Sequence, residues 1–227
     1  MRILIFGTSG MVGQGVLRAC LGDDRVDQIV SVGRSNIGVR HAKLREIQLD
    51  ELFAVTTVAD QLVDFHACFF CLGVSAVGMS EADYTRVTFD LTTTIAALLA
   101  RGNPAMTFVY VTGAGTARDS RMMWARVKAR TEDALATLPF KAVYFFRPGF
   151  IQPLHGIRSK TGWYNAIYAL TRPLAPLLLR LFPGQATTTE RVGEAMINVA
   201  ASGYPQPVLA NAQINAAALR VGAPPSL

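Results

Sequence analysis

Three glycines near the N-terminus have the spacing of a phosphate-binding loop. The apolar run Ile3 to Phe6 leads into Gly7-x-x-Gly10-x-x-Gly13, and a helical pattern follows. The first glycine permits a tight turn, the second lets the backbone approach a pyrophosphate, and the third permits close packing of the helix on the strand. The helix dipole and the free N–H groups at the start of the helix favour anionic phosphates. This context predicts a dinucleotide-binding loop formed by Gly7, Thr8, Ser9, Gly10, Met11, Val12 and Gly13.

The residues after the second predicted strand indicate which dinucleotide binds. An acidic residue here would bind the adenosine ribose hydroxyls of NAD, whereas this chain has Gly33-Arg34-Ser35. The Arg34 guanidinium can pair with a 2′-phosphate and Ser35 can donate to it, so NADP is favoured over NAD. The alternative for Arg34 is a solvated surface charge. Asp50 is a candidate partner of the adenine edge, or else the beginning of a helix.

Five apolar runs predict the strands that must position these loops. They are continuous and rich in β-branched or aromatic residues, as in strands buried on both faces of a parallel sheet: 2–6, 28–32, 66–72, 107–111 and 142–146. A weaker strand is predicted at 43–48, and helical patterns cover 11–21, 81–100 and 119–138. Alternating strands and helices predict a Rossmann-like α/β fold with a doubly wound parallel sheet.

A glycine follows each of the five clear strands: Gly7, Gly33, Gly73, Gly113 and Gly149. The carboxyl ends of parallel strands line the ligand crevice of an open sheet, where glycine lets a ligand approach the backbone. Glycine is also common in any tight turn between a strand and a helix. Five such turns at one edge favour a long ligand that lies across it.

The rest of the chain departs from this rhythm. Residues 151–161 are loop-like, 163–182 is apolar with two prolines, and a helix at 189–201 precedes a short strand at 206–210. We expect a single domain over 1–227, with a cofactor-binding core at 1–150 and a capping, substrate-side region at 151–227. Segment 163–182 is predicted to cover the crevice; the alternatives are a membrane-surface helix or a contact between the subunits of a homodimer.

The composition of the 227 residues excludes several classes of protein. Hydrophobic residues make up 51% and charged residues 17%, which supports a sizeable core and excludes a disordered tail. No signal peptide and no charge-free run of about 18 apolar residues is visible. The formal charge of +6 comes from scattered arginines without a nucleic-acid-binding signature, so no nucleic acid partner is expected.

Cysteine and histidine usage indicates neither redox chemistry nor a metal site. Three cysteines are too few for a secreted disulfide framework, which favours a cytoplasmic location. Cys68 and Cys71 form a C-x-x-C, but they lie in a predicted buried strand and are interpreted as core residues. The histidines have no metal-ligand spacing.

Several turn motifs together resemble the atypical short-chain dehydrogenase/reductase superfamily. They are the N-terminal glycine loop, the turns Cys71-Leu72-Gly73 and Thr112-Gly113, the helical Lys128 and Arg147-Pro148-Gly149. Within that superfamily the chain is most similar to the Tat-interacting-protein type of oxidoreductase-like proteins and to bacterial relatives labelled nucleoside-diphosphate-sugar epimerases. The resemblance covers residues 2–201. It implies that these turns, with Lys128, line the dinucleotide.

The resemblance also implies a catalytic Y-x-x-x-K on the helix after residue 113, and here the chain departs from it. Lys128 fits the lysine, and Thr112 fits the hydroxyl residue about a dozen positions before the tyrosine. Position 124 is tryptophan. An indole donates a hydrogen bond but does not release its proton in the working pH range, whereas a phenol does. Tyr84 and Tyr164 are candidates for a substitute acid, and half-buried packing is the alternative for both.

Two functions follow from these predictions. One is an NADP(H)-dependent oxidoreductase or epimerase acting on a small organic substrate, with Lys128 and Thr112 in the site and Trp124 in place of the tyrosine. The other is a catalytically weak or inactive NADPH-binding regulator that contacts a partner protein. Trp124 is the residue that keeps the second alternative open.

Overall fold

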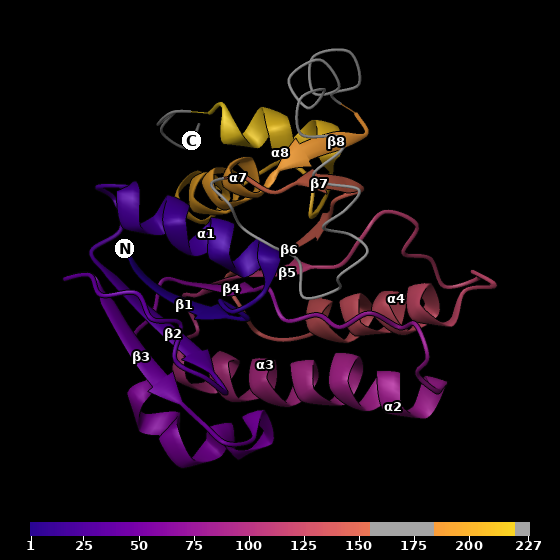
Figure 1. Cartoon of the computed structure of the whole chain (residues 1–227), viewed down its shortest axis with the longest axis horizontal. Helices are drawn as coiled ribbons and strands as arrows, with labels where there is room; N and C mark the ends of the chain where they lie inside the picture. The colour runs from indigo at the N-terminus through magenta and orange to yellow at the C-terminus, as the bar shows by residue number, and fades with distance from the viewer. Residues whose placement is uncertain (155–183, 221–227) are drawn as a thin grey trace.

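The main sheet of the computed structural model is parallel throughout and has the strand order β3-β2-β1-β4-β5-β6-β9 (Figure 1). The model describes residues 1–154 and 184–220. The strands are β1 (Arg2–Phe6), β2 (Gln28–Gly33), β3 (Leu44–Gln48), β4 (Ala67–Phe70), β5 (Thr107–Val111), β6 (Ala142–Arg147) and β9 (Val208–Ala210). Successive strands are added on one side of β1 up to β3 and then on its other side from β4 onward, as in doubly wound dinucleotide-binding folds. The predicted fold class is confirmed.

Helices cover both faces of the sheet (Figure 1). One layer holds α1 (Met11–Gly22), α7 (Thr189–Ser202) and α8 (Asn211–Ala218). The other holds the 3₁₀ helix η1 (Leu52–Gln61), the helix formed by α2 (Glu81–Thr85), η2 (Arg86–Asp90) and α3 (Leu91–Gly102), and α4 (Met123–Ala136). Two hydrophobic cores therefore lie on opposite faces of one sheet.

The first strand shows why the apolar runs are continuous. Leu4 and Phe6 belong to the core under α3, whereas Ile3 and Ile5 belong to the core under α1 and α7. All four side chains are 0% exposed. Successive side chains of a strand point to opposite faces, so a strand covered on both sides needs an apolar residue at every position. Each such side chain contributes about 1.5–3 kcal/mol on burial.

Several elements differ from the sequence-based expectation. The helix predicted at 81–100 contains a π-helical turn, η2, and residues 52–61 form a 3₁₀ helix that was not predicted. Residues 150–152 form β7 (Phe150–Gln152), which pairs in parallel with β8 (Ala186–Thr188), where a loop was expected. Strands of three residues are too short to show a hydrophobic period. Helix α8 was also missed.

Helices α1 and α7 cross at unusually short range. A Cβ atom added at Gly15 would lie 2.4 Å from Cβ of Thr189, and one added at Gly193 would lie 2.6 Å from Cβ of Ala19. Helix α7 begins at the predicted threonine cluster, where the Thr188 hydroxyl accepts a hydrogen bond from the N–H of Arg191 at 3.1 Å. Helix α7 therefore packs closely on the outer side of α1, the helix that follows the glycine loop.

Some predictions fall on residues outside the described part of the chain. They concern segment 163–182, with its proposed covering role and its membrane-surface alternative, and also Tyr164. Among the residues that the structure does describe, no helix combines the length and the apolar character needed to cross a bilayer.

Candidate functional site

The first and third glycines of the N-terminal loop lie against backbone that leaves no room for a side chain. Gly7 has φ +88°, a conformation that favours glycine, and its carbonyl oxygen accepts a hydrogen bond from the N–H of Gly10 at 2.9 Å. A Cβ at Gly7 would lie 2.7 Å from the carbonyl of Cys71. A Cβ at Gly13 would lie 2.1 Å from the carbonyl oxygen of Gly7. These distances match the roles predicted for the first and third glycines.

The start of α1 is the part of this loop suited to an anion. Gly10 is the N-cap residue and provides no side-chain capping hydrogen bond. The first N–H groups of an α-helix have no partner within the helix, and the helix dipole adds partial positive charge there. Thr8 is turned inward, since it is 2% exposed and its hydroxyl lies 2.7 Å from that of Ser31 on β2. Thr8 therefore anchors the loop to the neighbouring strand.

The predicted adenosine end lies at the same edge of the sheet. Gly33 pairs with Gln48, and the N–H of Leu49 donates to the carbonyl oxygen of Gly33 at 2.9 Å. These contacts bring the turn at Arg34 and Ser35 close to the residue after β3, which precedes Asp50. Arg34, Ser35 and Asp50 are all exposed. Their side chains are thus free of the core and accessible from the edge that carries the glycine loop.

Three of the four other turn glycines are open, whereas a Cβ at Gly149 would lie 3.2 Å from both Nδ2 of Asn211 and the carbonyl oxygen of Gln185. A Cβ at Gly73 would meet nothing within 4 Å, and one at Gly33 would approach only the carbonyl oxygen of Ser35, at 3.8 Å. At Gly113 the nearest atoms, Nζ of Lys128 and the carbonyl oxygen of Pro148, would be 4.0 Å away. Crowded glycines at the turn of β1 and open ones along the edge leave space for an extended ligand. The residues present therefore fit a dinucleotide.

Lys128 reaches this edge from α4. Its Nζ donates a hydrogen bond to the main-chain oxygen of Thr112 at 2.7 Å, just after β5. Burial disfavours the ammonium and lowers the pKa of Lys128 to about 8, although the charge of Glu132 opposes this shift. Near neutral pH the site therefore holds a cation with a proton that is more easily lost than that of an exposed lysine.

Trp124 lies one helical turn before Lys128 on the same helix face. The residue is half-buried, and a Cβ at Gly115 would lie 3.5 Å from Cη2 of its ring. The loop between β5 and α4 thus packs on the indole. In this position the ring supplies a flat apolar surface and one N–H donor, but no group that titrates.

The Thr112 hydroxyl is turned into the protein, away from the substrate side expected from the resemblance. It donates to Oε1 of Glu132 at 2.7 Å, and the carbonyl oxygen of Phe146 is a second acceptor at 3.2 Å. Thr112 is 6% exposed. Its single hydroxyl hydrogen is used internally, so in this arrangement Thr112 contributes its main-chain oxygen to the site.

Arg147 is engaged by the same carboxylate. Its Nε donates to Oε1 of Glu132 at 3.0 Å, and a terminal guanidinium nitrogen donates to Oε2. Glu132 is 4% exposed and the pair raises the pKa of Arg147. Sequence reasoning missed Glu132. The available signal was its place four residues after Lys128, which puts both side chains on one helix face.

The turn after β6 is held by main-chain contacts. The N–H of Ala114 donates to the carbonyl oxygen of Pro148 at 2.9 Å, which joins this turn to the one after β5. The N–H of Gly149 donates to Oδ1 of Asn211 at 3.1 Å. Pro148 and Gly149 therefore lie beside Gly113, as predicted, and are fixed from the C-terminal side by α8.

Tyr84 does not provide a surface phenol. It is 2% exposed, and burial raises its pKa. A phenol in that environment keeps its proton and lies in the protein interior. Among the described tyrosines, Tyr110 and Tyr144 are buried in β5 and β6. The predicted alternative for Tyr84, packing rather than acid catalysis, is the one that this geometry favours.

The C-x-x-C residues lie on opposite faces of the sheet. Cys68 belongs to the core under α3, whereas Cys71 packs on the core under α1. Burial raises the pKa of both thiols, that of Cys71 to about 12. Both thiols are free, and the N–H of Cys71 donates to the carbonyl oxygen of Phe6 at 2.9 Å. This arrangement agrees with a packing role and with a backbone contribution to the crevice.

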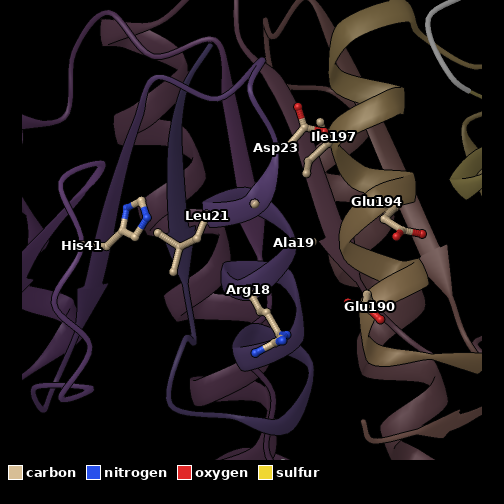
Figure 2. A pocket seen from close by; sticks show the side chains of 9 residues that line it. Arg18, Ala19, Leu21, Asp23, His41, Glu190, Glu194 and Ile197 are labelled. Atoms are coloured by element: carbon tan, nitrogen blue, oxygen red, sulfur yellow. The ribbon is translucent and has the colours of Figure 1, made fainter. Parts of the chain in front are cut away.

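A separate hollow of about 550 Å³ lies between α1 and α7 (Figure 2). Arg18 and Leu21 from α1, Glu190 and Glu194 from α7, and His41 line it. The lining part of α1 is its C-terminal half, whereas the glycine loop ends in its first turn, at Gly13. The hollow therefore lies away from the strand ends and from Lys128, and it is not the candidate site.

No known family model matches the chain. Among curated proteins, two from the yeast Scheffersomyces stipitis are similar. "Protein FMP52-1, mitochondrial" is 23% identical over 153 residues, which cover 66% of this chain and 67% of that protein. "Protein FMP52-2, mitochondrial" is 26% identical over 150 residues, 65% of each. The matched part is thus about two thirds of each relative.

These names correct the expected location. Both relatives are called mitochondrial, which contradicts the cytoplasmic expectation. The expectation rested on unpaired cysteines, and these indicate a reducing environment without identifying the compartment.

Solved structures resemble the chain over nearly its whole length. The Bordetella bronchiseptica enzyme WbmF in complex with NAD+ has a TM-score of 0.68 at 15% identity and covers 95% of this chain and 76% of its own. A UDP-glucuronic acid 4-epimerase from Bacillus cereus in complex with NAD has a TM-score of 0.67 at 11% identity, with 92% and 76% covered. A short chain dehydrogenase family protein from Francisella tularensis has 0.66 at 13%, with 93% and 98% covered. The chain therefore has the Rossmann-like fold of these solved proteins, which is the fold class that its sequence predicts.

Proposed function

We propose that the chain binds a nicotinamide dinucleotide along the C-terminal edge of its sheet and acts as a dehydrogenase-like enzyme. The observation that carries this proposal is the uncapped N-terminus of α1 beside a loop in which a Cβ at Gly7 or Gly13 would clash with backbone. Such a loop brings a pyrophosphate within reach of main-chain N–H groups. Similar structures that were solved with NAD support the same cofactor class.

NADP is the dinucleotide that we propose, and this rests on Arg34 and Ser35. Both are exposed after β2, where the ribose-binding acid of an NAD-specific protein would stand. A guanidinium and a hydroxyl can bind a 2′-phosphate, whereas they offer no acceptor pair for the two ribose hydroxyls. WbmF and the Bacillus cereus epimerase are described with NAD, so the proposed preference for NADP rests on the residues of this chain alone.

The nicotinamide, when bound, would supply or accept hydride, and the surrounding residues would position it and exclude water. Lys128 would hold the nicotinamide ribose with its ammonium, and Trp124, one turn earlier on the same helix face, would line the pocket with its indole ring. Trp124 cannot donate the proton of the reaction, because an indole does not exchange one in the working pH range. Without a general acid, turnover is expected to be about 10²- to 10⁴-fold slower than with one.

The second function, an NADPH-binding regulator with little or no activity, is favoured by one residue, Trp124. Cofactor binding would not depend on a phenol, because the glycine loop, Arg34 and Lys128 are the groups that we propose hold the dinucleotide. The substrate class of the first function is a small carbonyl compound or a nucleotide sugar. A nucleotide sugar is suggested by MoeE5, which is described in complex with UDP-glucose and NAD and has a TM-score of 0.65 at 16% identity.

Turnover separates these two functions. Native protein, Trp124→Tyr and the control Trp124→Phe are assayed with NADPH against aldehydes, ketones, quinones and UDP-sugars. We expect slow native turnover that Trp124→Tyr raises and Trp124→Phe does not. Activity confined to Trp124→Tyr would refute the enzyme and leave the regulator, whereas rapid native turnover would refute the regulator. If neither NADPH nor NADH raises the melting temperature of the native chain, cofactor binding itself is refuted.

A further inference from the structure

We propose that Glu132 is a positioning residue of the candidate site, which holds Thr112 and, through it, the side chain of Lys128. The residue is not among the predicted site residues, and it is buried behind two of them, Thr112 and Arg147. Its role for Lys128 concerns the geometry of this chain alone. Its consequence for dinucleotide affinity rests on the function proposed above.

The contacts of Glu132 join three elements at one point. From α4, its Oε1 accepts the hydroxyl of Thr112 at 2.7 Å, and both carboxylate oxygens accept from the guanidinium of Arg147. Thr112 follows β5 and Arg147 ends β6. The main-chain oxygen of Thr112 then accepts Nζ of Lys128 at 2.7 Å, one turn earlier on α4. A closed loop of contacts therefore runs from Glu132 through Thr112 to Lys128 and back along the helix.

The charges of these residues also act on one another. Burial lowers the pKa of Lys128, and the negative charge of Glu132 is the group that opposes this shift. The other charged group facing Glu132 is Arg147, whose pKa the pair raises. Asp133 also acts on Arg147 but is itself bonded to Arg118, and the buried phenol of Tyr110 experiences the charge of Glu132. Glu132 thus favours the protonated form of Lys128, against the effect of burial.

A buried ion pair can also be purely structural. Glu132 and Arg147 would then stabilise the junction of β6 with α4 without affecting Lys128. If Glu132 has only a structural role, replacing it lowers the melting temperature of the protein and leaves the pKa of Lys128 unchanged. The titration of Lys128 is therefore the measurement that separates the two roles.

The test compares Glu132→Gln with the matched control Asp133→Asn. The control removes a carboxylate at the next position of α4, where it pairs with the 74%-exposed Arg118. The protonation of Lys128 is followed by NMR in ¹³C-lysine-labelled protein, with Lys128→Met to assign the signal. We expect Glu132→Gln to lower the pKa of Lys128 by about one unit, as the loss of an opposite charge at close range does. Asp133→Asn is expected to leave it unchanged.

NADPH affinity gives a second measurement. If the pKa of Lys128 falls by about one unit from a value near 8, the protonated fraction of Lys128 at pH 8 falls from about one half to about one tenth. We therefore expect NADPH to bind Glu132→Gln about fivefold more weakly than Asp133→Asn at this pH, and the difference to shrink toward pH 6. Native titration and native affinity in folded Glu132→Gln would overturn the proposal.

A milder substitution tests the same proposal if Glu132→Gln does not fold. Thr112→Val keeps the Glu132–Arg147 pair and removes only the hydroxyl that links it to the site, and Thr112→Ser restores that hydroxyl. We expect Thr112→Val to weaken NADPH binding with little change in melting temperature, and Thr112→Ser to behave as the native protein. Equal binding by all three would overturn the linkage through Thr112. If native protein binds neither NADPH nor NADH, the proposed function fails, and the Lys128 titration alone decides the role of Glu132.

Discussion

The substitution Gly13→Ala tests the glycine loop at its tightest contact. The new Cβ would lie 2.1 Å from the carbonyl oxygen of Gly7, 2.6 Å from its carbonyl carbon and 2.8 Å from Cα of Thr8. All three are backbone atoms, so no side chain can rotate away. Relief requires α1 to move outward, but α7 covers its other side, where Gly15 meets Thr189.

The cost can be stated as a change in stability. Overpacking a tightly packed interior typically costs about 1–3 kcal/mol. In a chain of this size, each kcal/mol lowers the melting temperature by about 2–4 °C, so we expect a decrease of about 2–12 °C. The stabilisation by NADPH should disappear as well, because the loop can no longer present its N–H groups to the pyrophosphate.

Two further alanine substitutions complete the experiment. Gly22→Ala, at the exposed end of the same helix, would meet nothing within 4 Å and should be neutral or slightly stabilising. Gly10→Ala meets only the carbonyl oxygen of Gly7, at 3.3 Å, so it should fold but lose NADPH binding. Thermal unfolding with and without NADPH measures all three. A Gly13→Ala protein that melts and binds like Gly22→Ala would refute the interpretation of the loop.

Three other predictions concern charge and protonation. Arg34→Asp should reverse the preference from NADPH to NADH, as measured by the two dissociation constants; an unchanged ratio would show that Arg34 is only a surface charge. Because the pKa of Lys128 is about 8 in the folded chain and higher when unfolded, the free energy of unfolding should rise between pH 8 and 10 relative to Lys128→Met; a parallel pH dependence of the two proteins would contradict the low pKa. Cys68 and Cys71 should react with a disulfide reagent at pH 8 only as the protein unfolds, and fast labelling of the native chain would show that their thiolates are accessible.

The strands and turns were predictable because their signals are local. A strand covered on both faces must be apolar at every position, as Ile3 to Phe6 are, and a turn against the neighbouring backbone requires glycine, as at Gly7. Register and strand order then place the ends of all these strands at one edge. The fold class could therefore be predicted from the order of residues alone, and the location of the candidate site at this edge stays a prediction.

The direction of individual side chains could not be predicted in this way. The sequence predicts that the Thr112 hydroxyl faces a substrate. It faces the interior instead, where it donates to the carboxylate of Glu132, twenty positions later on α4, which the guanidinium of Arg147 on β6 also contacts. Tyr84 was considered at the surface, whereas the start of α2 turns it inward. Such choices depend on contacts between distant parts of the chain, and no periodicity of the sequence carries them.

The close crossing of α1 and α7 has a consequence for biosynthesis. Gly15 and Ala19 are made before Thr189 and Gly193, which cover them, because 174 positions separate Gly15 from Thr189 and Ala19 from Gly193. Contacts so distant in sequence form late in folding. The outer face of α1 can therefore be covered only after α7 has been made, and a fragment that ends at residue 150 would leave that face exposed to solvent and to association with other chains.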